Sequence, residues 1–272
     1  MRKAVVSGSF YPENKGDLID EVRKFLGKGK KDEIKACIVP HAGYTYSGKL
    51  AGEVLGKIGE KKTFIILGVN HSGLGSGISF SFQDFSTSLG IVKNNVKLGR
   101  EILGKLKLLG YADINENAHA EEHSIEVILP FLQLSQKQFD IVPIILKDLT
   151  DAACGRVAYI LSKFLNDDVC ILVSSDFTHY GLNYGFMPFN YNIKESLYLL
   201  DKGIIDSILS LDYKSVYEKA SKSTVCGLYG ITIVTELAKI MGWKAKLVEY
   251  YTSGDVSGDY SNVVGYAGII FQ

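Results

Sequence analysis

Short apolar runs alternate with longer amphipathic stretches along the 272-residue chain, a rhythm typical of an α/β fold. The apolar runs predict strands at 35–40, 63–69, 140–146, 168–175, 245–251 and 263–271. Their nearly continuous Val, Ile and Leu content indicates central strands that are covered on both faces. We therefore expect a mostly parallel or mixed central sheet.

Helices are expected between these strands, because apolar residues recur there every three or four positions. In residues 14–27, for example, Leu18, Val22 and Leu26 fall on one face. Similar patterns cover 47–59, 121–134, 151–165 and 223–242, and residues 192–222 predict two or three short helices. In the stretch 223–242, Ser223 or Thr224 is the expected N-cap and Gly242 follows the last turn.

No linker, low-complexity block or internal repeat interrupts this rhythm, and the glycine-rich residues 71–79 come nearest to an interruption. The pattern therefore predicts a single α/β domain over residues 1–272, with helices flanking the sheet.

The charge balance, the apolar runs and the cysteine content limit the classes of protein to which the chain can belong. Thirty basic residues balance thirty acidic ones, which argues against a nucleic-acid binder with its usual basic excess. No apolar window approaches the roughly 20 residues of a membrane span, and no signal peptide is recognisable. The four cysteines include no C-x-x-C pair, so reduced thiols in the cytoplasm are expected.

Three of the five histidines come directly after predicted strands: His41, His71 and His179. In doubly wound sheets, ligands bind beyond the carboxyl ends of the strands. Each histidine taken alone is better explained as a surface or satisfied core residue. Three of them at strand ends favour one shared site.

A metal ion is a natural reason to gather imidazoles, and two histidines with a third protein ligand leave open positions for chemistry. Cys226 is the candidate third ligand, because the predicted helix 223–242 places it in the first turn, where the helix dipole favours a thiolate. A buried apolar cysteine explains the same residue equally well.

Acidic residues stand close to the remaining histidines. Asp176 and His179 are three apart, so they can form an acid/base pair, or Asp176 can orient a metal ligand. His123 is predicted near the start of helix 121–134, where Glu121 and Glu122 complement the helix dipole and are interpreted as structural. His119 falls in a polar loop and receives no role.

Six motifs, taken together and in order, resemble the Memo family over nearly the whole chain. They are GSFYP at 8–12, PHAGYTYSG at 40–48, LGVNHSG at 67–73, EEHSIEVILPFLQ at 121–133, SSDFTHYG at 174–181 and CGLYGI at 226–231. The resemblance implies a fold like that of class III extradiol ring-cleaving dioxygenases. It also implies a link to a radical-SAM protein partner, since prokaryotic members are often described as one component of such a system.

The resemblance also implies roles for individual residues. His41 and His71 match the two metal-ligand histidines, and Cys226 takes the place of the dioxygenase glutamate. His179, with Asp176 beside it, matches the acid/base histidine, and His123 matches a further pocket histidine. A thiolate is a softer ligand than a carboxylate and is itself oxidisable, which puts ring cleavage by the dioxygenase route in question.

Three hypotheses follow. In the first, the pocket binds redox-active iron or copper and supports metal-dependent oxidoreductase chemistry, with His179 moving protons. In the second, a non-catalytic accessory protein uses the pocket to receive a peptide or a protein partner. In the third, His179 activates Cys226 as a nucleophile.

Overall fold

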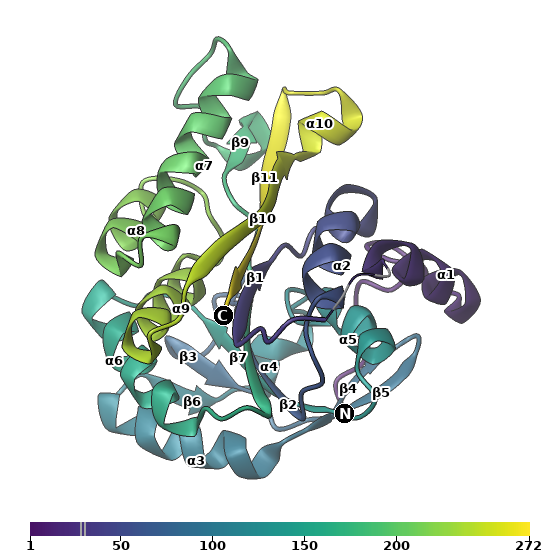
Figure 1. Ribbon diagram of the computed structural model, residues 1–272, viewed down its shortest axis with the longest axis vertical. Coiled ribbons are helices and arrows are strands. Elements are labelled where there is room, and N and C mark those ends of the chain that lie inside the picture. Colours follow the sequence, from purple (N-terminus) through teal and green to yellow (C-terminus); the bar gives the residue numbers. More distant parts are fainter. Residues whose placement is uncertain (28, 30) are drawn as a thin grey trace.

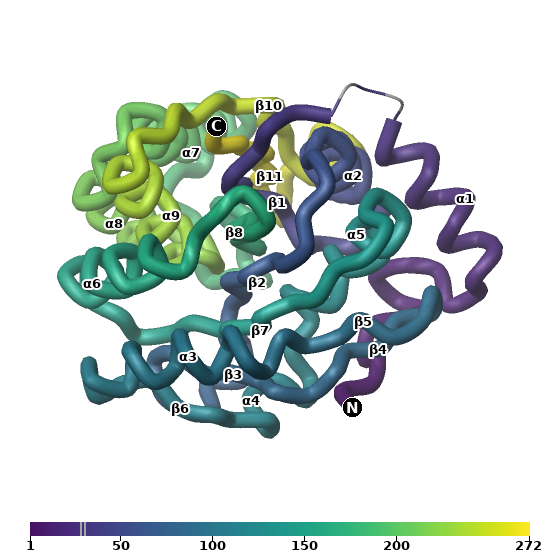
Figure 2. Tube along the Cα trace, turned by 60° about the horizontal axis from the view of Figure 1, so that its bottom comes forward, coloured from purple at the N-terminus to yellow at the C-terminus, as the bar shows by residue number. Residues whose placement is uncertain are grey.

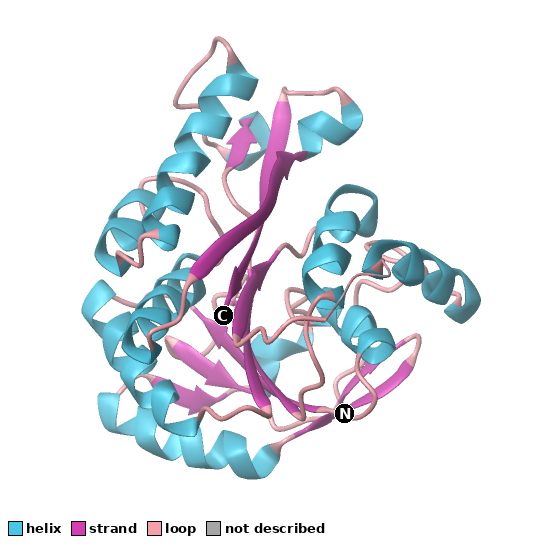
Figure 3. Ribbon diagram, in the orientation of Figure 1, coloured by secondary structure: helices cyan, strands magenta, loops and turns pink. Residues whose placement is uncertain are grey.

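The computed structural model describes residues 1–27, 29 and 31–272. Within these residues, eleven strands form one connected mixed sheet, and helices lie on both of its sides (Figure 1, Figure 3). The strands are β1 (Ala36–Val39), β2 (Thr63–Val69), β3 (Ile78–Phe80), β4 (Phe85–Thr87), β5 (Gly90–Asn94), β6 (Ala112–Ile114), β7 (Asp140–Leu146), β8 (Val169–Ser174), β9 (His179–Gly181), β10 (Ala245–Thr252) and β11 (Asn262–Phe271). The α/β prediction with a mixed sheet is confirmed.

The centre of the sheet is parallel. The main strand order is β10-β11-β1-β8-β2-β7-β3-β6, and β1, β8, β2 and β7 pair in parallel. Val39 pairs with Ser174, and Leu67 pairs with Val173, so the carboxyl ends of β1, β8 and β2 lie at nearly the same level. The antiparallel pair β10–β11 crosses the molecule and carries α10 at its tip (Figure 1).

Eight of the α-helices are α1 (Lys15–Leu26), α2 (Lys49–Gly56), α3 (Val96–Leu106), α5 (Leu129–Ser135), α6 (Asp151–Leu161), α7 (Ile193–Leu209), α8 (Tyr213–Ala220) and α9 (Leu228–Met241). Two short α-helices are α4 (Glu116–Ala120) and α10 (Ser253–Ser257). Figure 2 shows α1, α2 and α5 on one side of the strands and α6, α8 and α9 on the other. None of the helices in the described part of the chain combines the length and apolar character needed to cross a bilayer.

Alternation along the central strands divides the core into two layers. In β2, Ile65 and Leu67 pack into the layer that contains residues of α3, α6 and α9. The intervening Phe64 and Ile66 pack into the layer that contains residues of α1, α2 and α5. Because successive side chains of a strand point to opposite faces, a strand covered on both sides is apolar at every position.

All six predicted strands are confirmed, with ends that differ by at most one residue. The expectation that all are central is wrong for β10, which ends the main strand order, pairs with β11 and is only half-buried over most of its length. Lys246 and Glu249 suit such an edge. The pattern missed β3, β4, β5, β6 and β9, which have only three to five residues each.

Helix predictions are most accurate where the three-to-four-residue hydrophobic periodicity extends over many residues. Residues 14–27 form α1, 151–165 form α6 with a following 3₁₀ turn, and 192–222 form the two helices α7 and α8. In the stretch 47–59, α2 is shorter than expected and follows a π-helical turn at Tyr44–Gly48. The pattern missed α3, α4 and α10.

Two predicted helix starts are wrong, and both errors affect the histidine region. Residues 121–125 are non-helical, with turns at 121 and 124–125, and α5 begins only at Leu129 after a 3₁₀ turn at Glu126–Ile128. The helix predicted over 223–242 begins at Leu228, with Gly227 as N-cap. Thr224 does not cap it, because its hydroxyl accepts from the His179 amide and donates to the His179 carbonyl. Gly242 ends α9 in the left-handed conformation, as predicted.

The N-terminal segment is held to the body of the protein by Glu126, which is fully buried. Its carboxylate pairs with the Arg2 guanidinium and accepts hydrogen bonds from the Val5 and Val6 amides and the Tyr11 hydroxyl. These contacts set the path of the segment that carries Phe10.

Replacing Glu126 by Ala is expected to lower the free energy of unfolding by about 3–5 kcal/mol, because it leaves the Arg2 guanidinium buried without its partner. Urea denaturation measures the change. Asp206→Ala is the control, since it breaks the exposed Lys202–Asp206 pair and should cost at most about 1 kcal/mol. Equal small losses in both variants would contradict this account of Glu126.

Candidate metal centre

Three polar residues occupy equivalent positions at the carboxyl edge of the parallel strands. His41, His71 and Asp176 each stand two residues beyond the end of their strand, β1, β2 and β8 respectively. Parallel pairing brings these positions together, and all three line one pocket of about 400 Å³. The predicted location beyond the strand ends is therefore correct for both histidines.

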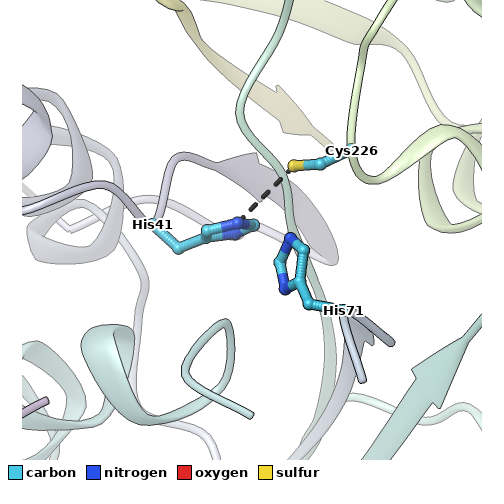
Figure 4. A group of neighbouring side chains, drawn as sticks. All are labelled: His41, His71 and Cys226. Atoms are coloured by element: carbon cyan, nitrogen blue, oxygen red, sulfur yellow. Dashed lines mark hydrogen bonds between the residues drawn. The ribbon is translucent and has the colours of Figure 1, made fainter. Parts of the chain in front are cut away.

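His41, His71 and Cys226 form a compact group (Figure 4). Their potential ligand atoms all lie within 4.8 Å of one another. Among them, His41 Nε2 and Cys226 Sγ lie 3.5 Å apart. The structure thus brings together the three residues that the sequence singled out as candidate metal ligands.

The hydrogen bonds of His41 determine which ring nitrogen has a free electron pair. Nδ1 lies 2.9 Å from the Ser174 hydroxyl, whose proton is directed at the Ser124 carbonyl. Ser174 must therefore accept from Nδ1–H, which leaves the lone pair on Nε2, facing Cys226. Burial lowers the pKa of His41 to about 4, so the ring is neutral near pH 7.

Glu122 holds His71 in the corresponding way. Its carboxylate lies 3.0 Å from His71 Nδ1 and also accepts the backbone amides of His71 and Ser124. Burial lowers the pKa of His71, but the hydrogen bond and the charge of Glu122 outweigh it, and the net shift is upward. Burial alone would raise the pKa of Glu122, and its bonds with His71 bring it down to about 2. The carboxylate directs Nδ1–H toward itself and leaves Nε2 for a ligand.

Cys226 lies just before α9 and not in its first turn. The Asp176 amide donates to Sγ at 3.2 Å, and the Ser175 hydroxyl lies 3.8 Å from Sγ. Gly227 permits this approach to the end of β8, since a Cβ there would lie 2.3 Å from that of Ser175. Burial and the charge of Asp176 raise the pKa of the thiol. The prediction of a helix-stabilised thiolate is therefore wrong, and without a cation the group is a thiol.

His123 completes a cluster of three imidazoles. Its ring stacks on His71 with centroids 4.8 Å apart and meets His41 edge-on at 5.5 Å. Phe10 also contacts the His123 ring edge-on, with centroids 5.0 Å apart. Burial lowers the pKa of His123. His71, Glu122 and His123 also lie close enough to form a second potential donor group, but the Glu122 oxygens are already engaged by His71 and Ser124.

His179 and Asp176 both line the pocket, but they are not joined to each other by a hydrogen bond in the described structure. His179 lies in β9, and its Nδ1 is 3.1 Å from the Thr224 carbonyl. A carbonyl only accepts, so Nδ1 carries the proton and Nε2 is the basic atom. Asp176 Oδ1 accepts the His41 amide at 2.9 Å and so orients the backbone of that histidine.

Sequence reasoning missed the groups that orient the ligands. The pattern predicts a helix-dipole role for Glu122, yet Glu122 is only 3 % exposed and binds His71. The sequence signal that could have identified such groups is a polar residue next to a buried apolar strand, such as Ser174 at the end of β8. The prediction of a loop at His119 is wrong: it lies in α4, is buried, and its ring nitrogen Nε2 contacts the Ser79 carbonyl away from the pocket.

Comparisons with known proteins find relatives that match this chain over nearly its whole length. A family model described as Memo-like protein matches residues 2–270. A MEMO1 family protein of Archaeoglobus fulgidus is 38% identical, with 100% of both chains covered. MEMO1 family proteins from Pyrococcus furiosus and Aquifex aeolicus are 38% and 37% identical, with 100% of this chain and 99% of each relative covered.

Replacing Glu122 by Gln is expected to lower the pKa of His71 below its ordinary value of 6.5 in chelator-treated protein, because burial then prevails. Histidine NMR titration measures it. A raised pKa stabilises the folded state below pH 6.5, and this stability is lost as the pH rises through the folded-state pKa. The wild type should therefore exceed the variant in unfolding free energy by more at about pH 5.5 than at about pH 8.5.

Glu121→Gln is the matched control, since Glu121 is the adjacent carboxylate but is exposed. It should leave the pKa of His71 unchanged. An unchanged His71 titration in Glu122→Gln would contradict the assigned pairing.

Proposed function

The chain belongs to the Memo family, and from this premise we propose that it binds redox-active iron or copper through His41, His71 and Cys226 and supports metal-dependent oxidoreductase chemistry on a small substrate. The observation that carries the proposal is the 3.5 Å approach of His41 Nε2 to Cys226 Sγ, with the donor atoms of all three residues within 4.8 Å. We further propose that residues 1–272 act as one Memo-like domain, which the single connected sheet supports.

The donor set fits a metal ion. Bond lengths of about 2.3 Å to sulfur and about 2.1 Å to nitrogen, at a tetrahedral angle, separate the two donors by about 3.6 Å. The distance between His41 Nε2 and Cys226 Sγ is 3.5 Å. Both histidines also have their Nδ1 atoms engaged, by Ser174 and Glu122, which leaves Nε2 for coordination.

The thiol influences both the choice of metal and its pH dependence. Thiolate and imidazole together suit copper(I), zinc and iron better than magnesium or calcium. Burial and the Asp176 charge raise the pKa of Cys226, so a bound cation must displace the thiol proton. Loading should therefore release a proton and weaken as the pH falls.

Around such a centre, the protein residues would position a substrate and move protons. Three protein ligands leave open coordination positions, and bound iron or copper would supply redox chemistry there. His179 presents a basic Nε2, since Thr224 accepts the proton of Nδ1. His123 forms a second wall of the pocket and is kept neutral by burial, which lowers its pKa. Asp176 keeps His41 in place through its backbone amide.

The same geometry favours metal binding over nucleophilic catalysis by Cys226. The imidazole in contact with Sγ is that of His41, at 3.5 Å, and no hydrogen bond joins His179, the proposed activating residue, to Sγ within the described residues. A raised thiol pKa also disfavours the thiolate that a nucleophile requires.

A second candidate function, that of an accessory protein, is supported by exposed apolar side chains in a segment that borders the pocket through Tyr184. In the segment between β9 and α7, Leu182 is 82% exposed, Tyr191 72% and Met187 48%. A surface of this kind suits a protein partner, such as the radical-SAM protein implied by the resemblance, or a peptide.

Anaerobically purified protein is expected to hold close to one iron or copper ion per chain, measured by mass spectrometry. Cys226→Ala should reduce the retained metal at least about tenfold, because it removes a ligand. Cys154→Ala is the control, since Cys154 is a buried thiol within α6. A wild-type protein that refuses both Fe(II) and Cu(I) would contradict the metal proposal. A loaded protein inert toward oxygen and peroxide would contradict the oxidoreductase part alone.

For the accessory function, the radical-SAM protein is expected to be recovered with the wild type in a pull-down, and recovery should fall several-fold in Leu182→Asp. Leu108→Asp is the control, because Leu108 is equally exposed, at 83%, but lies in the turn after α3. His41→Ala should retain the partner. Failure of the wild type to recover it would contradict this function.

A further inference from the structure

The pocket beside the proposed metal ligands is acidic. Among its lining residues, Asp176 and Asp259 carry carboxylates, and the described lining includes no lysine or arginine. Lys194, on neighbouring α7, is already paired with Asp255 at 2.7 Å. His71, whose pKa is raised, is paired with Glu122, so an anionic ligand would meet no unpaired cationic side chain among the described lining residues.

Of the two carboxylates, that of Asp176 is expected to interact more strongly with a ligand. It is only 4% exposed, and its one side-chain hydrogen bond in the described structure runs from the His41 amide to Oδ1. Neither Asp176 nor Asp259 forms an ion pair within the described residues. Because Asp176 lines the pocket, its Oδ2 remains for whatever enters. A buried carboxylate with no cationic partner is costly, and a cation placed beside it removes that cost.

A metal ion at the ligand group would not reverse this preference. A divalent ion there is balanced by the Cys226 thiolate and by the Glu122 carboxylate that holds His71. The charges of Asp176 and Asp259 then remain uncompensated.

Aromatic side chains line the same pocket: Phe10, Tyr46, Tyr184 and Tyr266. Aromatic rings pack well against an apolar or ring-containing body, and they also attract organic cations through the ring quadrupole. A pocket of about 400 Å³ suits a small ligand and not a large cofactor.

We propose that the pocket binds a small organic cation, an ammonium group on an aromatic body, with the ammonium at Asp176 and the Asp259 carboxylate adding negative charge to the lining, and that it rejects anions of the same shape. This inference names a substrate class for the proposed function and rests on it for the chemistry. Ligand binding itself requires only the carboxylates and rings of the pocket.

The test is calorimetric binding of three probes that share one ring: tyramine, 4-ethylphenol and 4-hydroxyphenylacetate, which are cationic, neutral and anionic. Tyramine should bind at least about tenfold more tightly than 4-hydroxyphenylacetate, with 4-ethylphenol between them, since a unit charge a few ångströms away shifts affinity by this much. The affinity for tyramine should fall with added salt, while that for 4-ethylphenol should not.

Two isosteric variants locate the charge. Asp259→Asn should reduce the preference for tyramine over 4-ethylphenol several-fold, and Asp176→Asn should reduce it further because Asp176 is buried. Asp167→Asn is the matched control, since Asp167 is an exposed aspartate that pairs with Lys35 outside the pocket. The control should keep the wild-type preference. Circular dichroism of each variant reports whether it is folded.

Equal affinities for the three probes, tighter binding of the anion, no measurable binding of tyramine, or an unchanged preference in both pocket variants would each overturn the proposal. Every titration is run on chelator-treated and on Fe(II)-loaded protein. A charge preference that persists in protein unable to hold metal would support this inference while the metal proposal fails. Metal loading without a charge preference would support the metal proposal and overturn this inference.

Discussion

The parallel pairing of β1, β8 and β2 is the constraint on which the site depends. Register at the sheet centre sets the ends of these strands at nearly the same level, and His41, Asp176 and His71 each follow two residues later. The strands are buried on both faces, so a slip in register would move an entire set of apolar side chains into the wrong layer. The packing that stabilises the fold therefore also fixes the separation of the two imidazoles.

Hydrogen bonds then convert this proximity into a defined donor set. Ser174 and Glu122 each engage an Nδ1 atom, so both histidines present Nε2. Cys226 is distant from both histidines in the sequence, and its sulfur lies beside them because Gly227 packs directly on Ser175. The site is thus held by the strand ends, the 122–124 turn and the segment before α9, and a shift in any one of them would change the donor geometry.

Two glutamates in one short segment illustrate how tertiary context divides the roles. Glu122 and Glu126 are both buried, four residues apart, in a stretch whose pattern resembles the start of a helix. Glu122 faces the strand ends and holds His71, whereas Glu126 faces the N-terminal segment and pairs with Arg2. The non-helical backbone at 121–125 lets the two side chains reach different partners. Sequence periodicity describes exposure along one element and contains no information about such partners.

By itself, the sequence determined the α/β class, six of the described strands and the candidate ligands His41, His71 and Cys226, because strand burial and chemically distinctive residues leave local signals. Only the tertiary structure decided that β10 lies at the edge, that Cys226 precedes α9 as a thiol, and that Glu122 and Ser174 orient the imidazoles. It also decided that Asp176, and not His179, stands at the position equivalent to the two histidines. These features depend on contacts between residues distant in the chain, such as Thr224 with His179, which override local capping and dipole preferences.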